Sequence, residues 1–323
     1  MSGDALNVKN LSVVYRTEAG PVHPVTNVSF NLRPGESLGL VGESGCGKTT
    51  VAMALLRLLP DNGEIVSGSI DMGGVDIVEL EGAELEDIRW RRISMVFQAA
   101  MNSLNPVHKV RDQIIEAIDA HETVPRAEAE ERTRRLFDLV GLDEQLLERY
   151  PHEYSGGMRQ RAVIAMALAC NPEIVIADEP TTALDVIVQD RILKELQSIQ
   201  DQKEMAMIYI SHDVAVIAEV SDTIAVMYAG QFVEKGPSDV VFARPIHPYT
   251  DALLASVPSV RGERKELRFL AGEPPSLSDI PASCPFAPRC SRALPVCDAE
   301  IPPLIGDDTH WAACHNPVEA ILS

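Results

Sequence analysis

The feature that most constrains the fold is a glycine-rich octapeptide, Gly42-Glu43-Ser44-Gly45-Cys46-Gly47-Lys48-Thr49. It fits the pattern G-x-x-x-x-G-K-[ST] of a phosphate-binding loop, which requires a buried strand before it and a helix after it. Residues 36–41 are apolar enough for such a strand, and residues 50–59 contain no helix breaker before Pro60. The octapeptide therefore predicts an α/β fold that binds a nucleoside triphosphate.

The residue types in this loop indicate its chemistry. Glycines let the backbone curl so that successive N–H groups point at phosphate oxygens, and the start of the following helix adds a partial positive charge. Lys48 is predicted to reach the β- and γ-phosphates, and the Thr49 hydroxyl is predicted to bind Mg²⁺. The loop alone does not show what the hydrolysis of the nucleotide drives.

Composition limits the classes of protein that remain. The 323 residues and the hydrophobic content of 46% allow two domains, or one large domain with an appendage. No apolar run approaches the ~18–20 residues that span a bilayer, and the N-terminus lacks the basic and apolar regions of a secretory signal. The formal net charge of −20 weighs against nucleic-acid binding. We therefore expect a chain that stays in the cytoplasm and works at a membrane only through a partner.

Strand and helix patterns alternate along most of the chain, which favours a mainly parallel sheet covered on both faces. Helical spacing dominates from about residue 100 to 170, so a helical subdomain is predicted there. From Pro258 onward the chain holds ten of its 22 prolines and is expected to be irregular. The expected strands are 6–15, 28–32, 93–97, 173–178, 205–210, 223–228 and 231–235, with a strand pair in 65–77, and the expected helices are 83–92, 110–120, 126–140, 143–150 and 186–202.

Two further motifs narrow the chemistry. The apolar strand 174–177 ends in Asp178, which would carry a carboxylate to the Mg²⁺ beside the phosphate loop. Glu179 follows directly and is placed to orient and polarise an attacking water. The segment 155–159, Ser-Gly-Gly-Met-Arg, opens a helix and fits either a second anion site or a plain N-cap. Its position, with Gly157 21 residues before Asp178, favours the anion site.

Taken in order, these motifs resemble those of the nucleotide-binding subunits of ATP-binding-cassette (ABC) transporters, over nearly the whole of residues 5–235. Segment 155–159 is similar to the signature motif of that family, although Met158 stands where Gln is commoner and Tyr154 where Leu is commoner. The resemblance implies a P-loop NTPase fold of the ABC type. It also assigns further single residues: Tyr15 stacks on adenine, Gln98 is the Q-loop glutamine, residues 183–185 form the D-loop and His212 is the switch histidine.

The resemblance implies a full set of site residues. Catalysis would depend on Lys48, Gln98, Glu179 and His212. Mg²⁺ would be held by Thr49, Gln98 and Asp178. ATP would be bound by Tyr15, Gly42, Glu43, Ser44, Gly45, Cys46, Gly47, Lys48, Thr49, Thr50, Gln98 and Asp178, and by the signature residues Ser155, Gly156, Gly157 and Met158 of the opposing subunit.

The family mechanism implies partners as well. Two such subunits meet head to tail and hold two ATP molecules between them, so a second ABC ATPase subunit is expected, either a homologous chain or a second copy of this one. Two transmembrane permease subunits would carry the cargo, and an extracytoplasmic solute-binding protein would act indirectly. The chain would then lie peripherally on the cytoplasmic face of the membrane, and no nucleic acid would take part.

A narrower resemblance points to the oligopeptide/dipeptide/nickel importer branch. It is carried by residues 97–106, 150–155 and 247–250, and by an extension from 245 to 323. The function implied is uptake of di- and oligopeptides, with oligosaccharide or nickel as alternative cargo and a soluble ABC ATPase acting on nucleic acid as the rival class. The implied domains are an ATPase core (1–99 and 171–244), a helical subdomain with the signature motif (100–170) and the C-terminal extension (245–323).

Four of the six cysteines lie in this extension, at Cys284, Cys290, Cys297 and Cys314. Their spacing resembles the four cysteines that hold a [4Fe–4S] cluster in some members of the branch. Four thiolates can close either an iron–sulfur or a Zn²⁺ site, and the spacings are wider than those of common zinc knuckles. The residues themselves leave three readings open: a cluster, Zn²⁺, and free or paired cysteines. His310 and His315 flank the last cysteine and are possible alternative ligands, but the four cysteines are favoured over them.

Overall fold

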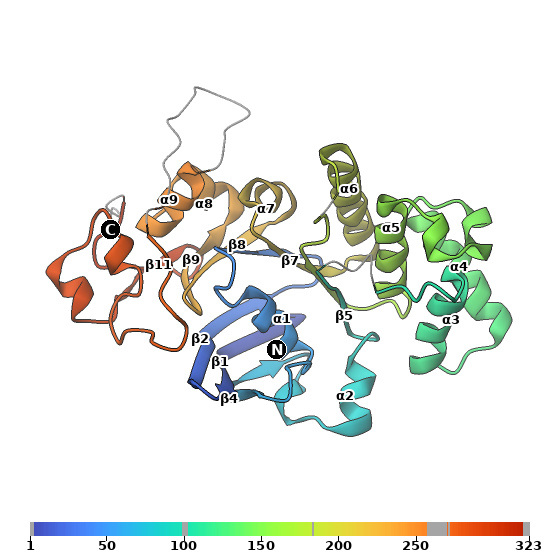
Figure 1. The fold of residues 1–323 in the computed structure, drawn as a ribbon, viewed down its shortest axis with the longest axis horizontal. Coiled ribbons are helices and arrows are strands. Elements are labelled where there is room, and N and C mark those ends of the chain that lie inside the picture. The colour runs from blue at the N-terminus through green and yellow to red at the C-terminus, as the bar shows by residue number, and fades with distance from the viewer. Residues whose placement is uncertain (1–2, 99–102, 183, 257–269, 271, 319–323) are drawn as a thin grey trace. The chain divides into compact units, whose positions relative to one another are not determined.

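The computed structural model describes residues 3–98, 103–182, 184–256, 270 and 272–318 (Figure 1). The chain divides into two compact units, each with its own packed interior. The first unit consists of Met1–Ala5, Leu32–Glu36 and Glu79–Ile208, and the second of Leu6–Asn31, Ser37–Val78 and Tyr209–Ser323.

The second unit contains a three-stranded sheet with the order β2-β1-β4. β1 and β4 run antiparallel, and alternate residues of β1, among them Leu6, Val8, Leu11 and Val13, are almost completely buried. This alternation is what a half-buried antiparallel sheet requires. The strands are β1 (Leu6–Thr17), β2 (Gly20–Leu32) and β4 (Gly63–Asp71).

A second sheet in this unit carries the phosphate loop and has the strand order β10-β11-β9-β8-β3. β3 is parallel to β8, whereas β8, β9, β11 and β10 pair antiparallel. The strands are β3 (Ser37–Val41), β8 (Thr223–Tyr228), β9 (Gln231–Pro237), β10 (Leu304–Gly306) and β11 (Trp311–Ala313). The helices are α1 (Lys48–Leu55), α7 (Val214–Val220), α8 (Ser238–Ala243) and α9 (Pro248–Ala255), with short 3-10 turns η1 (Ile77–Glu79), η5 (Ala287–Arg289) and η6 (Pro295–Asp298).

The first unit combines a parallel strand pair with a group of helices. Ile93 pairs with Ile174 and Val96 with Ala177, so β5 (Ile93–Val96) and β6 (Ile174–Asp178) run side by side, both fully buried. The helices are α2 (Gly82–Ile88), α3 (Val110–His121), α4 (Arg126–Leu139), α5 (Gly156–Ala167) and α6 (Val186–Lys203), with the 3-10 turns η3 (Glu144–Glu148) and η4 (Pro151–Glu153). β7 (Ala206–Ser211) leads from this unit into the second. Within the part of the chain that is described, no helix is long and apolar enough to cross a bilayer.

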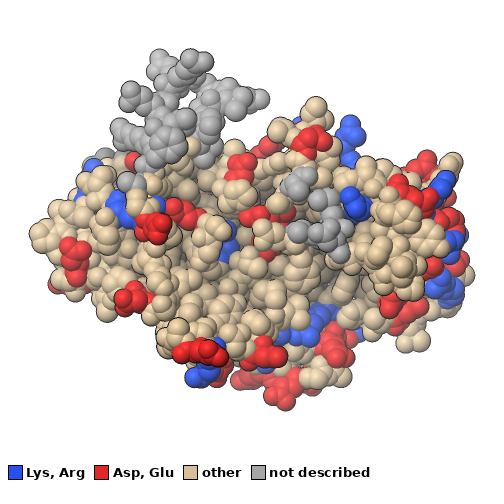
Figure 2. Space-filling model, in the orientation of Figure 1, with Lys and Arg blue, Asp and Glu red and all other residues tan. Residues whose placement is uncertain are grey.

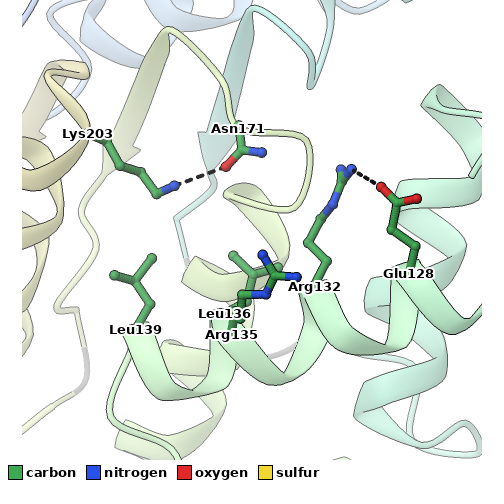
Figure 3. A pocket seen from close by; sticks show the side chains of 7 residues that line it. All are labelled: Glu128, Arg132, Arg135, Leu136, Leu139, Asn171 and Lys203. Atoms are coloured by element: carbon green, nitrogen blue, oxygen red, sulfur yellow. Dashed lines mark hydrogen bonds and ion pairs between the residues drawn. The ribbon is translucent and has the colours of Figure 1, made fainter.

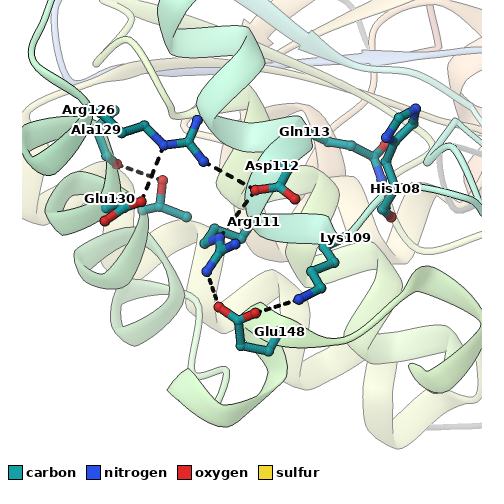
Figure 4. A network of polar contacts seen from close by, with 10 residues as sticks. His108, Lys109, Arg111, Asp112, Gln113, Arg126, Ala129, Glu130 and Glu148 are labelled. Carbon is teal, nitrogen blue, oxygen red and sulfur yellow. Dashed lines mark hydrogen bonds and ion pairs between the residues drawn. The ribbon is translucent and has the colours of Figure 1, made fainter.

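A network of ion pairs joins α3 to α4 and η3 in the helical part of the first unit (Figure 4). The Glu148 carboxylate accepts from Lys109 at 2.6 Å and also from Arg111, while Asp112 pairs with Arg111 at 3.2 Å and with Arg126 at 3.3 Å. The hydrogen bond from Lys109 lowers the pKa of Glu148. Exposed pairs of this kind contribute little stability individually, so the apolar contacts of the three elements hold them together and the ion pairs fix their orientation.

Most of the predicted elements are confirmed within a few residues, and three expectations are wrong. The expected strand pair at 65–77 is a single strand, because Gly73 and Gly74 adopt positive φ angles and turn the chain into η1. The expected helix 143–150 is the shorter 3-10 turn η3. The sheet of the second unit is mixed, because β8 and β9 are joined by a tight hairpin in which Ala229 and Gly230 both have positive φ. Residues 99–102 of the motif 97–106 and residues 257–269 of the expected extension lie outside the described residues.

A buried polar cluster attaches the start of the C-terminal extension to β9. The Glu234 side chain is completely buried and accepts N–H groups of Ile246 and His247 at 2.8 and 2.9 Å, and it also contacts His310 Nε2 at 2.8 Å. His247 Nδ1 accepts the Tyr249 N–H at 3.0 Å and so caps α9. Burial lowers the pKa of His247 to about 4. The imidazole is therefore neutral in the folded protein at physiological pH.

This burial predicts a pH-dependent stability. In the unfolded chain His247 takes up a proton near its usual pKa of about 6.5, but in the folded chain only near 4. Between these values the unfolded state binds more protons, so the free energy of unfolding falls as the pH falls. We expect the wild type to lose about 2 kcal/mol more than His247→Asn between pH ~7.5 and ~5, since Asn keeps the capping acceptor without titrating. Denaturant unfolding of both proteins measures this difference; equal pH dependence would contradict it.

Candidate nucleotide-binding site

The phosphate loop lies between β3 and α1 in the second unit. Gly42 has a φ of 155° and Gly47 a φ of 112°. A Cβ atom at Gly42 would lie 2.2 Å from the Met227 carbonyl oxygen, and one at Gly47 would lie 2.0 Å from the Pro24 carbonyl oxygen. Both positions therefore require glycine for their backbone angles and for their close packing.

The Lys48 side chain is folded back over this loop and is almost completely buried. Its ammonium group donates to the carbonyl oxygens of Gly42 at 2.7 Å and Glu43 at 3.0 Å. Burial raises the pKa of the neighbouring Cys46 thiol, which keeps it neutral as an apolar filler of the loop. A cation held at the centre of a glycine loop is what the binding of a polyphosphate requires.

Other predicted nucleotide contacts gather on the same unit. The Tyr15 hydroxyl donates to Thr50 Oγ1 at 3.2 Å, so the end of β1 lies beside α1. Gly63 faces the Tyr15 ring, where a Cβ atom would be only 2.7 Å away. Thr49 is exposed on the first turn of α1, and His212 is exposed directly after β7. The second unit therefore carries Tyr15, which is expected to contact adenine, and the loop residues 42–50, which are expected to contact phosphate and Mg²⁺. It also carries the expected switch histidine, His212.

The predicted acid–base residues lie on the first unit, where β6 ends. Asp178 is buried at the last position of the strand, and Glu179 follows with a φ of 48°. This left-handed backbone is uncommon for a residue other than glycine and is often found at functional sites. The Glu179 carboxylate accepts from Gln98 Nε2 at 3.0 Å and from Thr182 Oγ1 at 2.9 Å. Sequence reasoning identified Glu179 and Gln98 but missed Thr182, whose only signal is a hydroxyl three residues after the acid.

The signature segment forms the N-terminus of α5. Ser155 is the N-cap, and its Oγ accepts the Met158 N–H at 3.3 Å. A Cβ atom at Gly157 would lie 2.7 Å from the Val188 side chain of α6, so a larger residue there would have to displace that side chain. Tyr154 is buried and donates its hydroxyl to the Leu146 carbonyl at 2.6 Å, which explains how tyrosine is accommodated where leucine is commoner. In the D-loop, Ala183 lies outside the described residues, and Asp185 caps α6.

The four cysteines of the extension lie in one small, strand-poor region. Backbone N–H groups point at three of the sulfur atoms: Arg292 at Cys290, Leu294 at Cys297 and Asn316 at Cys314, at 3.3–3.4 Å. Burial, together with the other three cysteines, raises the pKa of Cys314 to about 11. Among the described residues, however, no group of three or more His, Cys, Asp or Glu side chains is arranged to hold a metal ion. The expected cluster is therefore not confirmed by the side-chain arrangement.

A separate surface pocket of about 280 Å³ lies on the first unit (Figure 3). It is lined by residues of α4 together with Asn171 and Lys203. Its basic side chains already have partners, since Arg132 pairs with Glu122 at 2.8 Å and Lys203 donates to Asn171 at 3.0 Å. None of the motif residues lines this pocket, so it is not the nucleotide site.

Comparison with known proteins agrees with this geometry. Residues 25–182 match the ABC transporter family, and residues 233–297 match the family described as oligopeptide/dipeptide transporter, C-terminal region. The chain is 44% identical over 319 residues to the oligopeptide transport ATP-binding protein OppD of Escherichia coli K12, covering 98% of this chain and 94% of that protein. It is also 44% identical over 311 residues to OppD of Bacillus subtilis 168, covering 95% and 87%.

Solved structures show the same fold. The dimeric post-hydrolysis state of the ATP-binding cassette MJ0796 bound to ADP and Pi matches with a TM-score of 0.64 at 26% identity, covering 72% of this chain and 98% of that one. This chain therefore belongs to the ABC transporter ATP-binding proteins, in the family of the oligopeptide transport ATP-binding proteins.

The position of Lys48 predicts a loss of nucleotide affinity when its charge is removed. We expect Lys48→Ala to weaken ATP binding by roughly tenfold or more, since a hydrogen bond to a charged group contributes about 1.5–3 kcal/mol. Lys194→Ala, which removes an exposed lysine paired with Asp190 on α6, is the matched control and should bind ATP normally. Titration with a fluorescent ATP analogue measures both. Unchanged affinity in the Lys48 variant would show that the loop does not bind the nucleotide.

Proposed function

We propose that this chain is the ATP-hydrolysing subunit of an importer that takes up di- and oligopeptides. The observation that carries the proposal is the extent of the similarity: it continues beyond the cassette through residues 233–297, and the relatives matched over nearly their full length are named as oligopeptide transport ATP-binding proteins. Oligosaccharide or nickel cargo is the alternative within the same class. No observation on the described residues favours either over peptides.

The geometry supports a division of tasks in hydrolysis. Lys48 and the amides of the glycine loop bind the β- and γ-phosphates, while Tyr15 supports the adenine. Thr49, Gln98 and Asp178 are the residues that would hold Mg²⁺, which supplies charge neutralisation at the phosphates. The chemistry of this donor set, a hydroxyl, an amide oxygen and a carboxylate, suits a hard cation.

Glu179 is the proposed general base, and its surroundings suggest how it is kept in place. Gln98 and Thr182 hold one of its carboxylate oxygens, so the group has a fixed direction before the water arrives. A positioned carboxylate that accepts a proton from the attacking water accelerates such a step by about 10²–10⁴. His212 would contact the γ-phosphate from the end of β7.

We further propose that two ATPase subunits act as a head-to-tail pair. The related cassette bound to ADP and Pi is dimeric, which supports this arrangement. Ser155 and the first turn of α5 form an anion-binding helix end that would face the γ-phosphate held by the other subunit. Val186 and Ile187, next to the D-loop, are 80% and 77% exposed and would be covered in such a pair. The mate is a homologous ATPase subunit or a second copy of this chain.

The same proposal places the chain on the cytoplasmic face of the membrane, bound to two permease subunits and served indirectly by a solute-binding protein. The proposed domain roles follow: residues 1–99 and 171–244 form the ATPase core, residues 100–170 the helical subdomain and residues 245–323 the extension.

The rival function, that of an ABC ATPase acting on nucleic acid, has little electrostatic support. The net charge is −20, and on the face in Figure 2 basic side chains are mixed with acidic ones rather than gathered into a patch.

For the extension we infer that Cys284, Cys290, Cys297 and Cys314 hold a [4Fe–4S] cluster, with Zn²⁺ as the alternative. The backbone N–H groups directed at Cys290, Cys297 and Cys314 support this, because hydrogen bonds to sulfur stabilise thiolate ligands and tune a cluster. The ligand atoms of a cluster lie farther apart than those around one ion, since irons and sulfides lie between them. A bound cluster would cross-link this proline-rich segment.

The proposed function predicts the effect of removing the base. Glu179→Gln should retain ATP and abolish both hydrolysis and peptide uptake, because the amide cannot accept the proton. Glu131→Gln, an exposed residue of α4 that pairs with Arg134, is the control and should transport normally. Uptake of a labelled peptide into vesicles containing the assembled transporter provides the measurement. Undiminished uptake by Glu179→Gln would remove the residue from this role, and recovery of nucleic acid instead of permeases on purification would favour the rival function.

The cysteine proposal has its own test. Protein purified without oxygen should be brown with visible absorbance and contain about four irons per chain, and Cys297→Ser should lose both. Cys170→Ser alters a buried thiol outside the extension and should keep them. A colourless wild type carrying zinc would establish the alternative metal, and one carrying neither would leave free or paired cysteines.

A further inference from the structure

Glu43, the second residue of the phosphate loop, forms hydrogen bonds with three other side chains through its carboxylate, its N–H and its carbonyl oxygen. Its carboxylate accepts two hydrogen bonds from the Arg289 guanidinium, at 2.6 and 2.9 Å. Its N–H donates to the Tyr249 hydroxyl at 3.0 Å, and its carbonyl oxygen accepts from Lys48 Nζ at 3.0 Å. Two of these partners, Arg289 and Tyr249, lie in the C-terminal extension, and the third, Lys48, belongs to the loop itself.

Arg289 is built into its position rather than lying on the surface. Its side chain is only 5% exposed, against 27% for Glu43. One guanidinium nitrogen also reaches the Tyr228 hydroxyl at 3.3 Å, and the guanidinium carbon lies 5.8 Å from the centre of that ring. Contact with Glu43 raises the pKa of Arg289 further above its usual value, so the residue is always charged.

Aromatic packing holds the segment that carries Arg289. Phe286 is 3% exposed and packs edge-on against Tyr228 and Tyr249, with ring centres 5.3 Å apart in both pairs. Tyr228 and Tyr249 in turn lie 4.6 Å apart. The turn η5 therefore cannot move without disturbing the residues that contact Glu43. Phe286 and Arg289 both lie between Cys284 and Cys290, two of the four cysteines of the extension.

We propose that Arg289 is a positioning residue for nucleotide binding: acting through Glu43, it fixes the carbonyl on which the Lys48 ammonium rests. A two-pronged pair between a guanidinium and a carboxylate fixes direction as well as distance. Arg289 also neutralises an acidic side chain that belongs to the loop where a polyphosphate must bind. The inference depends on nucleotide binding at this loop and is independent of the cargo and of any group held by the cysteines.

Removing the guanidinium tests the proposal. Full-length Arg289→Ala should bind ATP about tenfold or more weakly, with the larger change in KM than in kcat, as is typical when a supporting residue behind a binding group is removed. Arg289→Lys, which keeps the charge but not the paired geometry, should recover only part of the affinity. Arg134→Ala, which removes an exposed arginine of α4, is the matched control and should bind ATP as the wild type does.

A double-mutant cycle separates this role from general destabilisation. If Arg289 acts through Glu43, the losses in Arg289→Ala and Glu43→Ala should not add, and amide hydrogen exchange should become faster in residues 42–48 of both variants. Should Arg289→Ala fail to fold, Arg289→Lys and Glu43→Ala provide the same two readouts. Wild-type affinity in Arg289→Lys and Glu43→Ala, or losses that simply add in the double variant, would overturn the proposal.

Discussion

The Lys48 ammonium is held on the carbonyl oxygens of Gly42 and Glu43, and the proposed binding of nucleotide depends on this contact. An ammonium is a compact, strongly hydrated charge, so burying it requires acceptors at fixed positions. Gly42 and Gly47 allow the loop to place these carbonyls, because the chain can turn there without a Cβ atom meeting Met227 or Pro24. An incoming triphosphate would then meet a cation that is already almost completely buried.

In the first unit, the proposed general base Glu179 is likewise held in a fixed position before any nucleotide binds. Glu179 has the left-handed backbone that costs a non-glycine residue about 1–2 kcal/mol, and its carboxylate is held by Gln98 and Thr182. Asp178 is buried at the end of β6, whereas the Glu179 carboxylate accepts hydrogen bonds from Gln98 and Thr182. This difference suits the proposed roles, in which Asp178 would bind Mg²⁺ and Glu179 would activate the water.

Sequence reasoning found the elements whose function requires a fixed local spacing. The octapeptide 42–49 and the strand ending at Asp178 are of this kind, because each motif has its glycines and lysine, or its carboxylate, at set positions within a few residues. Contacts between distant segments could not be found in this way. Glu43 and Arg289 are 246 residues apart, and any of the 28 basic residues could have paired with this acid. The burial of Glu234 against His310 is likewise a consequence of β11 pairing with β9, which the proline-rich sequence does not reveal.

The most direct test is the structure of the assembled transporter carrying Glu179→Gln, determined with ATP bound. ATP held between two chains should touch Lys48 of one ATPase subunit, and its γ-phosphate should accept hydrogen bonds from the Ser155 hydroxyl and the Gly157 N–H of the opposing subunit. A nucleotide bound by the phosphate loop alone, with no signature residue of either subunit in contact with it, would contradict the coupling of hydrolysis to transport described here.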